Sequence, residues 1–274
     1  MKQAVSIFLS AVLLICVVGS IPQLNTERVY ADGYNGSTYE SSSTELIEYH
    51  SKTDDESSIK GGLPKYSNGG TNYNTCANVA GATLLGYYDK DYGELIPAFD
   101  SARVIRDKIL YSKQTSAVQT VIDELVVKMK TNQTGNGTTV NNFKNGLQLY
   151  VNEKGRNISY NSVMSSKRFN IEIYKKSIDN KQPVALFVSK YTMIPISDLK
   201  QNDQTDILRQ DHFGGDHVLI GYGIREIRYF NKAGALMKQV TLLMAATGYK
   251  QTPLVYIKID DRMQIIDGYN INIY

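Results

Sequence analysis

Apolar residues in the first half of the chain recur at intervals of three and four positions, which is the spacing of one face of an α-helix. In the clearest case, Val79, Leu84 and Leu85 form an apolar stripe behind Asn74 or Thr75, either of which can cap the helix. The pattern predicts helices at residues 74–88, 101–111, 116–130 and 140–152, and a shorter helix at 171–178.

The second half of the chain changes to short apolar runs that polar turns separate. Residues 184–188 are continuously apolar, as in a buried strand, and residues 231–234 have the composition of a turn between two further runs. Residues 191–216 are expected to be a long loop. Helices followed by antiparallel strands predict an α+β fold. The predicted strands are 184–188, 218–222 with 227–229, 240–246, 254–259 and 265–274.

The N-terminus has the pattern of a signal peptide. Lys2 precedes an apolar core at residues 4–18. Residues 29–31 have the small-x-small pattern of a signal-peptidase cleavage site, which would fall before Asp32. The pattern predicts a signal peptide over residues 1–31, and therefore a secreted protein. An uncleaved anchor is disfavoured, because about 15 apolar residues are fewer than the roughly 20 that a membrane-spanning helix needs.

The mature chain divides by composition. Residues 32–60 are rich in Ser, Thr, Gly, Asp and Glu, and predict a polar linker or a propeptide. Residues 61–274 carry the core-forming patterns and are expected to form one domain. The formal net charge is +3 and basic residues do not occur in blocks, which argues against nucleic acid as a partner. No stable membrane anchor is expected, and nothing in the sequence implies a metal or an organic cofactor.

The chain has two cysteines, and only Cys76 would remain after removal of the signal peptide. An unpaired thiol outside the cell is prone to oxidation, so its retention points to a use, most simply as a nucleophile. Cys76 falls in the first turn of the predicted helix 74–88. Unpaired N–H groups and the positive end of the helix dipole favour a thiolate at such a position.

A cysteine nucleophile needs a base, and the chain has three histidines. His50 lies in the polar N-terminal segment, where an exposed position is expected. His212 and His217 lie close together, and His217 is the better candidate because it opens a buried strand directly after a glycine-containing loop. A zinc site is disfavoured, since structural zinc normally takes four protein ligands.

Residues 74–82 and the following residues 84–89 resemble the nucleophile helix of papain-like cysteine peptidases, and most closely that of the secreted bacterial C39-like branch. Residues 217–222 are loosely similar to the histidine motif of that family. The resemblance implies a papain-like α+β fold, in which N-terminal helices, including the nucleophile helix, pack on a C-terminal antiparallel sheet. It also implies that Cys76 is the nucleophile and His217 its base.

The resemblance assigns three further positions, each with a departure from the family pattern. The glutamine that helps to form the oxyanion hole in the family corresponds to Gly70, so Asn74 is the candidate side-chain donor, although Asn74 is equally placed to cap the helix. The residue that orients the histidine corresponds to Thr247. Asp260, at the end of the next strand, is a nearby carboxylate that offers an alternative orienting group for His217.

The resemblance therefore predicts a secreted cysteine peptidase that hydrolyses peptide bonds through Cys76 and His217. Its partner would be a peptide or protein substrate, with cell-wall peptide as a narrower option, and association with the cell wall is left open. One alternative is a cell-wall peptide amidase or transpeptidase, which uses the same chemistry. The other is a catalytically inactive binding protein that keeps the fold.

Overall fold

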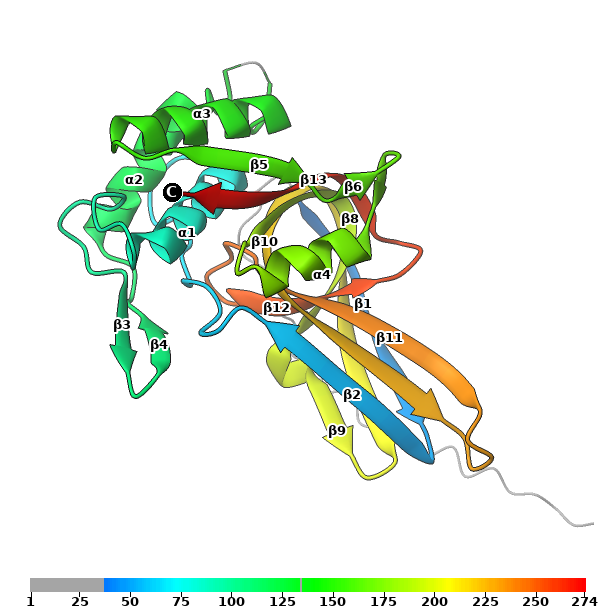
Figure 1. Ribbon diagram of the computed structural model, residues 1–274. Helices are drawn as coiled ribbons and strands as arrows, with labels where there is room; N and C mark the ends of the chain where they lie inside the picture. The colour runs from blue at the N-terminus through cyan, green and yellow to red at the C-terminus, as the bar shows by residue number, and fades with distance from the viewer. Residues whose placement is uncertain (1–36, 134) are drawn as a thin grey trace, which may run out of the picture.

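The structure of the protein is a computed structural model, and it describes residues 37–133 and 135–274. The predicted signal peptide lies outside the described residues. Within them, four α-helices stand against a large antiparallel sheet (Figure 1). The helices are α1 (Cys76–Asp89), α2 (Ser116–Lys128), α3 (Val140–Glu153) and α4 (Ile171–Asp179), with a short 3₁₀ helix, η1 (Ile196–Asp198). The strands are β1 (Thr38–Glu48), β2 (Ser51–Ser58), β3 (Ala102–Ile105), β4 (Lys108–Tyr111), β5 (Ile158–Ser162), β6 (Met164–Ser165), β7 (Arg168–Phe169), β8 (Val184–Pro195), β9 (Leu199–Asn202), β10 (Thr205–Phe230), β11 (Leu236–Ala246), β12 (Leu254–Ile259) and β13 (Gln264–Ile273).

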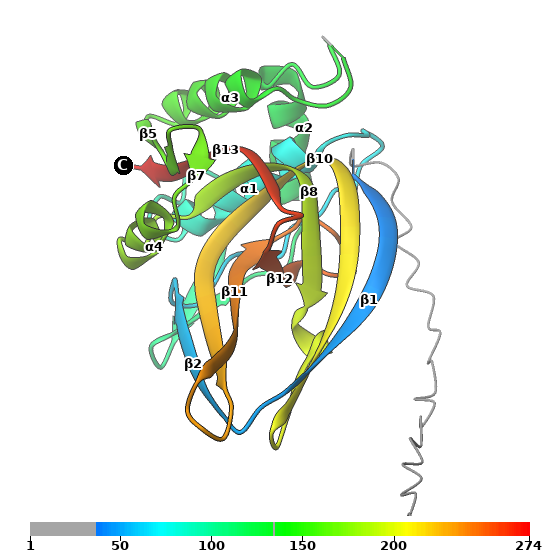
Figure 2. The ribbon, with the colours of Figure 1, turned by 90° about the vertical axis from the view of Figure 1, so that its right-hand side faces the viewer.

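Nine of the described strands form one antiparallel sheet, part of which closes on itself. β8 pairs with both β10 and β12, and β11 joins β10 to β12, so these four strands make a ring of pairings (Figure 2). β13 continues the sheet from β8, and β5 forms its far edge. β1, β2 and β9 each pair with the long strand β10. β10 is therefore the strand on which most of the sheet is assembled.

The helix α1 is buried along almost its whole length, between β10 on one side and α2 and α3 on the other. Small residues allow this close packing: a Cβ atom at Gly81 would stand 3.0 Å from both Leu125 and Met129. At the far end of the helix, Tyr88 donates a hydrogen bond of 2.5 Å from its hydroxyl to the Ile271 carbonyl of β13. The helix is consequently held in a fixed position against the sheet.

The prediction of a papain-like α+β fold is wrong. The protein is β-rich, since a single large antiparallel sheet dominates the described residues and only four α-helices pack against it. The predicted loop at residues 191–216 contributes much of the difference, because it continues β8 and then forms η1, β9 and the first half of β10. Its polar residues can lie in strands because side chains from other strands bond to them. Asp206, for example, is fully buried among hydrogen-bond donors.

The helix predicted at residues 101–111 is also wrong, because this segment forms the hairpin β3–β4. Arg106 and Asp107, at its tip, have φ values of 46° and 63°, the pair of positive values that a tight two-residue hairpin turn requires. Val104 lies opposite Ile109 across the hairpin. Ile105 and Ile109 are four positions apart, which suits one face of a helix as well as two strands joined by a tight turn, so spacing alone did not distinguish the two.

Residues 38–58 form β1 and β2, in place of the polar linker that composition predicts. Ion pairs with the rest of the sheet compensate for the lack of aliphatic side chains. Asp54 accepts two hydrogen bonds from Arg225, at 2.8 and 2.7 Å, and Glu45 pairs with Lys258 at 2.9 Å. The folded unit therefore includes β1 and β2, which lie before residue 61.

Most other predicted elements are confirmed. Helices α1, α2, α3 and α4 match the predictions within two or three residues, and β12 matches its predicted bounds. The runs 218–222 and 227–229 belong to one strand, β10, whose 26 residues continue through both. Among the described residues, no helix combines the length and the apolar character needed to cross a bilayer.

The contact between α2 and α3 gives a first testable prediction. A Cβ atom at Gly146 would stand 2.6 Å from the Met129 backbone nitrogen and 2.7 Å from the Lys128 carbonyl carbon, and backbone atoms cannot move aside as a flexible side chain can. We expect Gly146→Ala to lower the free energy of unfolding by about 1–3 kcal/mol through overpacking. Urea denaturation measures the change. Gly93→Ala is the matched control, because a Cβ there meets nothing within 4 Å, and an equal loss in both variants would contradict the argument.

Candidate active site

Cys76 is the first residue of α1 and is half-buried against the core. Asn74, with a φ of 54°, turns the chain into the helix, and Thr75 is the N-cap residue but makes no capping hydrogen bond with its side chain. The first N–H groups of α1 are thus not bound by a side-chain cap, and they surround the position of the thiol. The prediction that Cys76 lies at a helix start is confirmed.

The surroundings of the sulfur do not favour a thiolate at rest. Burial raises the pKa of Cys76 to about 11, while the backbone N–H groups of Val218 and Ala77 act against the rise and the charge of Asp216 adds to it. The helix N-terminus was expected to lower this pKa, but the loss of water around the sulfur outweighs it. Cys76 is therefore a neutral thiol near pH 7 in this conformation.

His217 lies on β10 directly after a β-bulge. Between Gly214, opposite Lys190, and His217, opposite Val188, β10 contains one residue more than β8. Gly215 takes the positive φ of 85° that this turn in the strand requires. Asp216 is exposed whereas His217 is 2% exposed, so the bulge directs the imidazole into the protein.

A hydrogen bond and flat aromatic contacts hold the imidazole of His217 in place. Its Nε2 lies 2.9 Å from the backbone carbonyl oxygen of Thr247, and a carbonyl oxygen can only accept, so Nε2 carries the proton. The ring stacks on Tyr249, with centroids 4.9 Å apart and planes 6° apart, and on Tyr191 at 5.8 Å and 18°. In the neutral ring Nδ1 is then the basic nitrogen.

The fold brings Cys76 and His217 to the same place. The backbone N–H of Val218, the residue after His217, lies close enough to the Cys76 sulfur to oppose the rise of its pKa. A charge on Cys76 also raises the pKa values of Tyr191 and Tyr249, the two rings that stack on His217, although burial has the larger effect on both. A thiol at a helix start and an imidazole on the adjoining strand therefore have the same two tyrosine rings as neighbours.

Of the other predicted site residues, Thr247 contacts His217 and Asp260 lies elsewhere. Thr247 contacts His217 as predicted, but through its backbone carbonyl; its hydroxyl donates to the Thr252 carbonyl at 2.7 Å. Asp260 accepts from the Arg262 backbone N–H at 3.1 Å, in the turn after β12, and its charge acts on His212. Asp260 is thus not brought to His217.

Asn74 stays close to Cys76 in the chain and is half-buried at the entry to α1. It does not cap the helix, since the N-cap residue is Thr75. Its carboxamide remains a candidate oxyanion donor.

Four residues of the site escaped the sequence analysis: Ser37, Tyr191, Phe213 and Tyr249. The rings of Tyr191 and Phe213 stack with centroids 5.2 Å and planes 7° apart, and Phe213 also stacks on Tyr249 at 6.2 Å. The Tyr191 and Tyr249 hydroxyls lie 2.9 Å apart, and both bond to Ser37. Tyr249 could have been predicted from its position two residues after Thr247. No local pattern in the sequence indicated Ser37, Tyr191 or Phe213.

The site offers a thiol, an imidazole with a defined tautomer, backbone N–H groups and an aromatic wall. No family model, curated protein or solved structure matches this chain. Among the described residues, no group of three or more His, Cys, Asp and Glu side chains is arranged to hold a metal ion. The functional groups that are present suit nucleophilic and acid–base chemistry.

The other two histidines lie elsewhere. His212 is bound between Ser43, at 2.9 Å from Nε2, and Thr192, at 3.1 Å from Nδ1. Burial is the main reason that the pKa of His212 is lowered. These two hydroxyl contacts tie β1 and β8 to β10.

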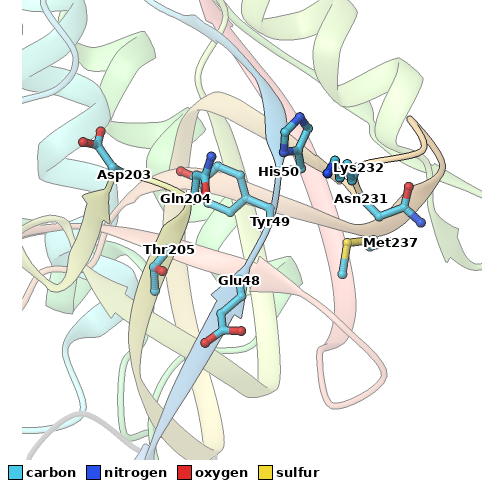
Figure 3. Close-up of a pocket in the computed structure, with 9 residues that line it drawn as sticks. All are labelled: Glu48, Tyr49, His50, Asp203, Gln204, Thr205, Asn231, Lys232 and Met237. Atoms are coloured by element: carbon cyan, nitrogen blue, oxygen red, sulfur yellow. The ribbon is translucent and has the colours of Figure 1, made fainter.

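His50 lines an open hollow where the β1–β2, β9–β10 and β10–β11 turns meet (Figure 3). Glu48, Asp203 and Lys232 also border it, and its polar side chains do not converge on one point. The hollow lies at the end of the sheet away from α1 (Figures 1 and 2). It is separate from the Cys76 site.

Proposed function

We propose that the protein is a secreted cysteine hydrolase that cleaves peptide or amide bonds, with Cys76 as nucleophile and His217 as general base and acid. The observation that carries the proposal is that Cys76 lies beside the part of β10 that holds His217. The Thr247 carbonyl accepts from Nε2–H of His217 and so leaves Nδ1 as the basic nitrogen. This is the division of roles that acyl transfer to a thiol needs.

In the proposed reaction, the Cys76 sulfur attacks the substrate carbonyl carbon while its proton passes to His217 Nδ1. The C–N bond then breaks, the imidazolium protonates the leaving amine, and a thioester remains. His217 next takes a proton from water, whose oxygen attacks the thioester, and the sulfur leaves and recovers the proton. The Thr247 carbonyl bonds to Nε2–H throughout and stabilises the cationic ring between the two steps.

Charge on the carbonyl oxygen in the transition state needs hydrogen-bond donors. The Cys76 backbone N–H, at the start of α1, is one candidate, and the Asn74 carboxamide is a second. Because the pKa of Cys76 is raised, a thiolate–imidazolium pair is not expected in the resting protein. His217 would instead take the thiol proton while the sulfur attacks the carbonyl carbon.

The pH dependence of alkylation tests this mode of activation. Because the pKa of Cys76 is raised to about 11, we expect the rate of reaction with iodoacetamide to rise about tenfold per pH unit from pH 7 to 10 and to level off near pH 11. The thiolate is the reactive form, so a raised pKa means slower alkylation at neutral pH. A plateau reached below pH 8 would contradict the expectation.

Turnover is tested separately with an unstructured, fluorescently labelled protein, with and without prior alkylation of Cys76. Peptide cleavage that alkylation stops supports a peptidase. Release of an amine from cell-wall peptide, or its transfer to a second peptide, would instead identify an amidase or transpeptidase that uses the same two residues.

The raised pKa of Cys76 also favours a second candidate function. A thiol that stays neutral and half-covered is equally suited to a catalytically inactive binding protein. For that function we expect no turnover on any peptide, together with alkylation kinetics that do not change when His217 is replaced.

A further inference from the structure

The first described residue, Ser37, reaches the Cys76 site from a distant part of the chain. Its Oγ accepts a hydrogen bond of 3.2 Å from the Tyr191 hydroxyl, and it also bonds to the Tyr249 hydroxyl. Those two tyrosines are the rings that stack on His217 and that respond to charge on Cys76. A small hydroxyl side chain of the protein itself is thus seated between two phenol groups at the edge of the proposed catalytic pair.

The next two residues, Thr38 and Tyr39, are extended and pair with β10 beside the site. Thr38 pairs with Gly214 and Tyr39 with Phe213, on the stretch of β10 that leads to His217. The Tyr39 ring packs edge-on against Phe213, with centroids 5.9 Å apart. Residues 37–39 therefore lie along the aromatic wall as an added strand, which is how an extended peptide binds to a sheet edge.

The register of β1 changes directly after this tip. Tyr39 is opposite Phe213 and Ser41 opposite His212, so Glu40 is an extra residue in the strand. Its side chain lies over Gly214, where a Cβ atom would collide with it, and its carboxylate pairs with Arg262. A bulge is a local break in the ladder, and here it separates the three tip residues from the rest of β1.

The remainder of β1 and the strand β2 are fastened to the sheet by ion pairs. Glu45 bonds to Lys258, and Lys52 to the buried Asp206 at 2.8 Å. By contrast, half-exposed Ser37 bonds to two phenols, and Glu40 makes an ion pair that is part-exposed on both sides. Thr38 and Tyr39 add their pairing with β10 and the ring contact with Phe213. The tip can therefore leave the aromatic wall without unfolding the strand behind it.

We propose that residues 37–40 occupy a substrate subsite of the Cys76 centre, one that takes an extended peptide with a small hydroxylated side chain, and that substrate binds by displacing them. The inference rests on the proposed function, because it assigns the subsite to that reaction. The two phenol hydroxyls are its polar groups, Phe213 is its apolar surface, and the edge of β10 supplies the main-chain hydrogen bonds.

The test uses the alkylation rate of Cys76 in the full chain at fixed pH, which does not depend on turnover. Ser37→Ala removes the hydroxyl and Glu40→Gln removes the ion pair with Arg262. Ser37→Ala is expected to raise the rate about tenfold, since loss of its hydrogen bonds to the two phenols corresponds to roughly that change in the open population. Glu40→Gln is expected to raise it by up to about fivefold, because an exposed ion pair contributes less. Ser43→Ala is the matched control: it removes a β1 hydroxyl that bonds to His212, away from the site, and its rate should equal that of the wild type.

A peptide added in excess identifies the ligand. The N-acetylated amide Ser-Thr-Tyr-Glu should restore slow alkylation to the Ser37→Ala protein, and the same peptide with Ala in place of Ser should do so at least about tenfold less well. Equal rates in wild type, Ser37→Ala and Glu40→Gln would overturn the inference, and so would equal protection by the two peptides. Faster alkylation with peptide protection but no hydrolysis of any substrate would leave the subsite standing and reject the proposed hydrolase.

Discussion

Cys76→Ala is expected to lower kcat/KM for peptide hydrolysis by about 10³-fold or more, to the level of the uncatalysed background. Among the described residues of the site, the Cys76 thiol is the group that would form the covalent intermediate of the proposed reaction, and neither Ser37 nor the two phenols is placed to replace it. The substitution removes one atom from a half-buried position, so the fold should persist. The measurement is the initial rate on the labelled protein substrate, with circular dichroism and the unfolding midpoint as checks on the fold.

His217→Ala is expected to cause a similar loss, because the thiol would have no base to take its proton. His217 is buried and bonded to Thr247, so its removal also costs stability; His217→Gln, which retains a polar side chain of similar length, separates the two effects. His212→Ala is the matched control on the same strand and should retain near wild-type kcat/KM. Hydrolysis that survives in either Cys76→Ala or His217→Gln would reject the assignment of the catalytic pair.

Asp206→Ala is expected to lower the free energy of unfolding by about 3–5 kcal/mol. The carboxylate is fully buried and accepts hydrogen bonds from Lys52, at 2.9 and 2.8 Å, from Tyr229 at 2.9 Å and from Tyr49 at 3.2 Å. Without it, the Lys52 ammonium and the Tyr229 hydroxyl lose an acceptor at a buried position, while the Tyr49 hydroxyl keeps the Asn202 carbonyl as a partner. Urea denaturation, monitored by tyrosine fluorescence, measures the change.

The matched control for Asp206 is a surface ion pair. Lys128 and Glu153 lie 2.5 Å apart, but the Glu153 side chain is 57% exposed, so Glu153→Ala should cost less than about 1 kcal/mol. A loss below about 1 kcal/mol for Asp206→Ala would mean that β1 and β2 do not depend on this cluster.

The element that carries Cys76 was predictable because its signal is local. The apolar stripe of α1 and the small residues that pack it against α2 lie within one short segment, and burial of that stripe favours a helix in any fold. The same holds for α2, α3 and β12. The hairpin β3–β4 was missed because its short apolar pattern suits both a helix and a hairpin, and the turn at Arg106 and Asp107 decides between them.

The papain-like architecture was wrong for a reason of a different kind. The resemblance around Cys76 covers a short stretch of sequence and concerns only residues that are near the thiol in the chain. It cannot predict how the 26 residues of β10 pair with strands on both sides. Polar sequences at residues 38–58 and 191–216 read as linker and loop because their partners lie far away in the chain. Asp206 illustrates this, since it becomes a buried anchor only where Lys52 and Tyr229 meet it.

By itself, the sequence determined that Cys76 stands at the start of a buried helix and that His217 stands at a glycine-rich break before a buried strand. Only the tertiary structure decided that Val218 reaches the Cys76 sulfur, that Thr247 orients His217 through its main chain, and that Ser37 lies against Tyr191 and Tyr249. Local propensity and apolar spacing depend on neighbours in sequence, whereas hydrogen bonds, burial and the pKa of Cys76 depend on which distant segments pair and exclude water.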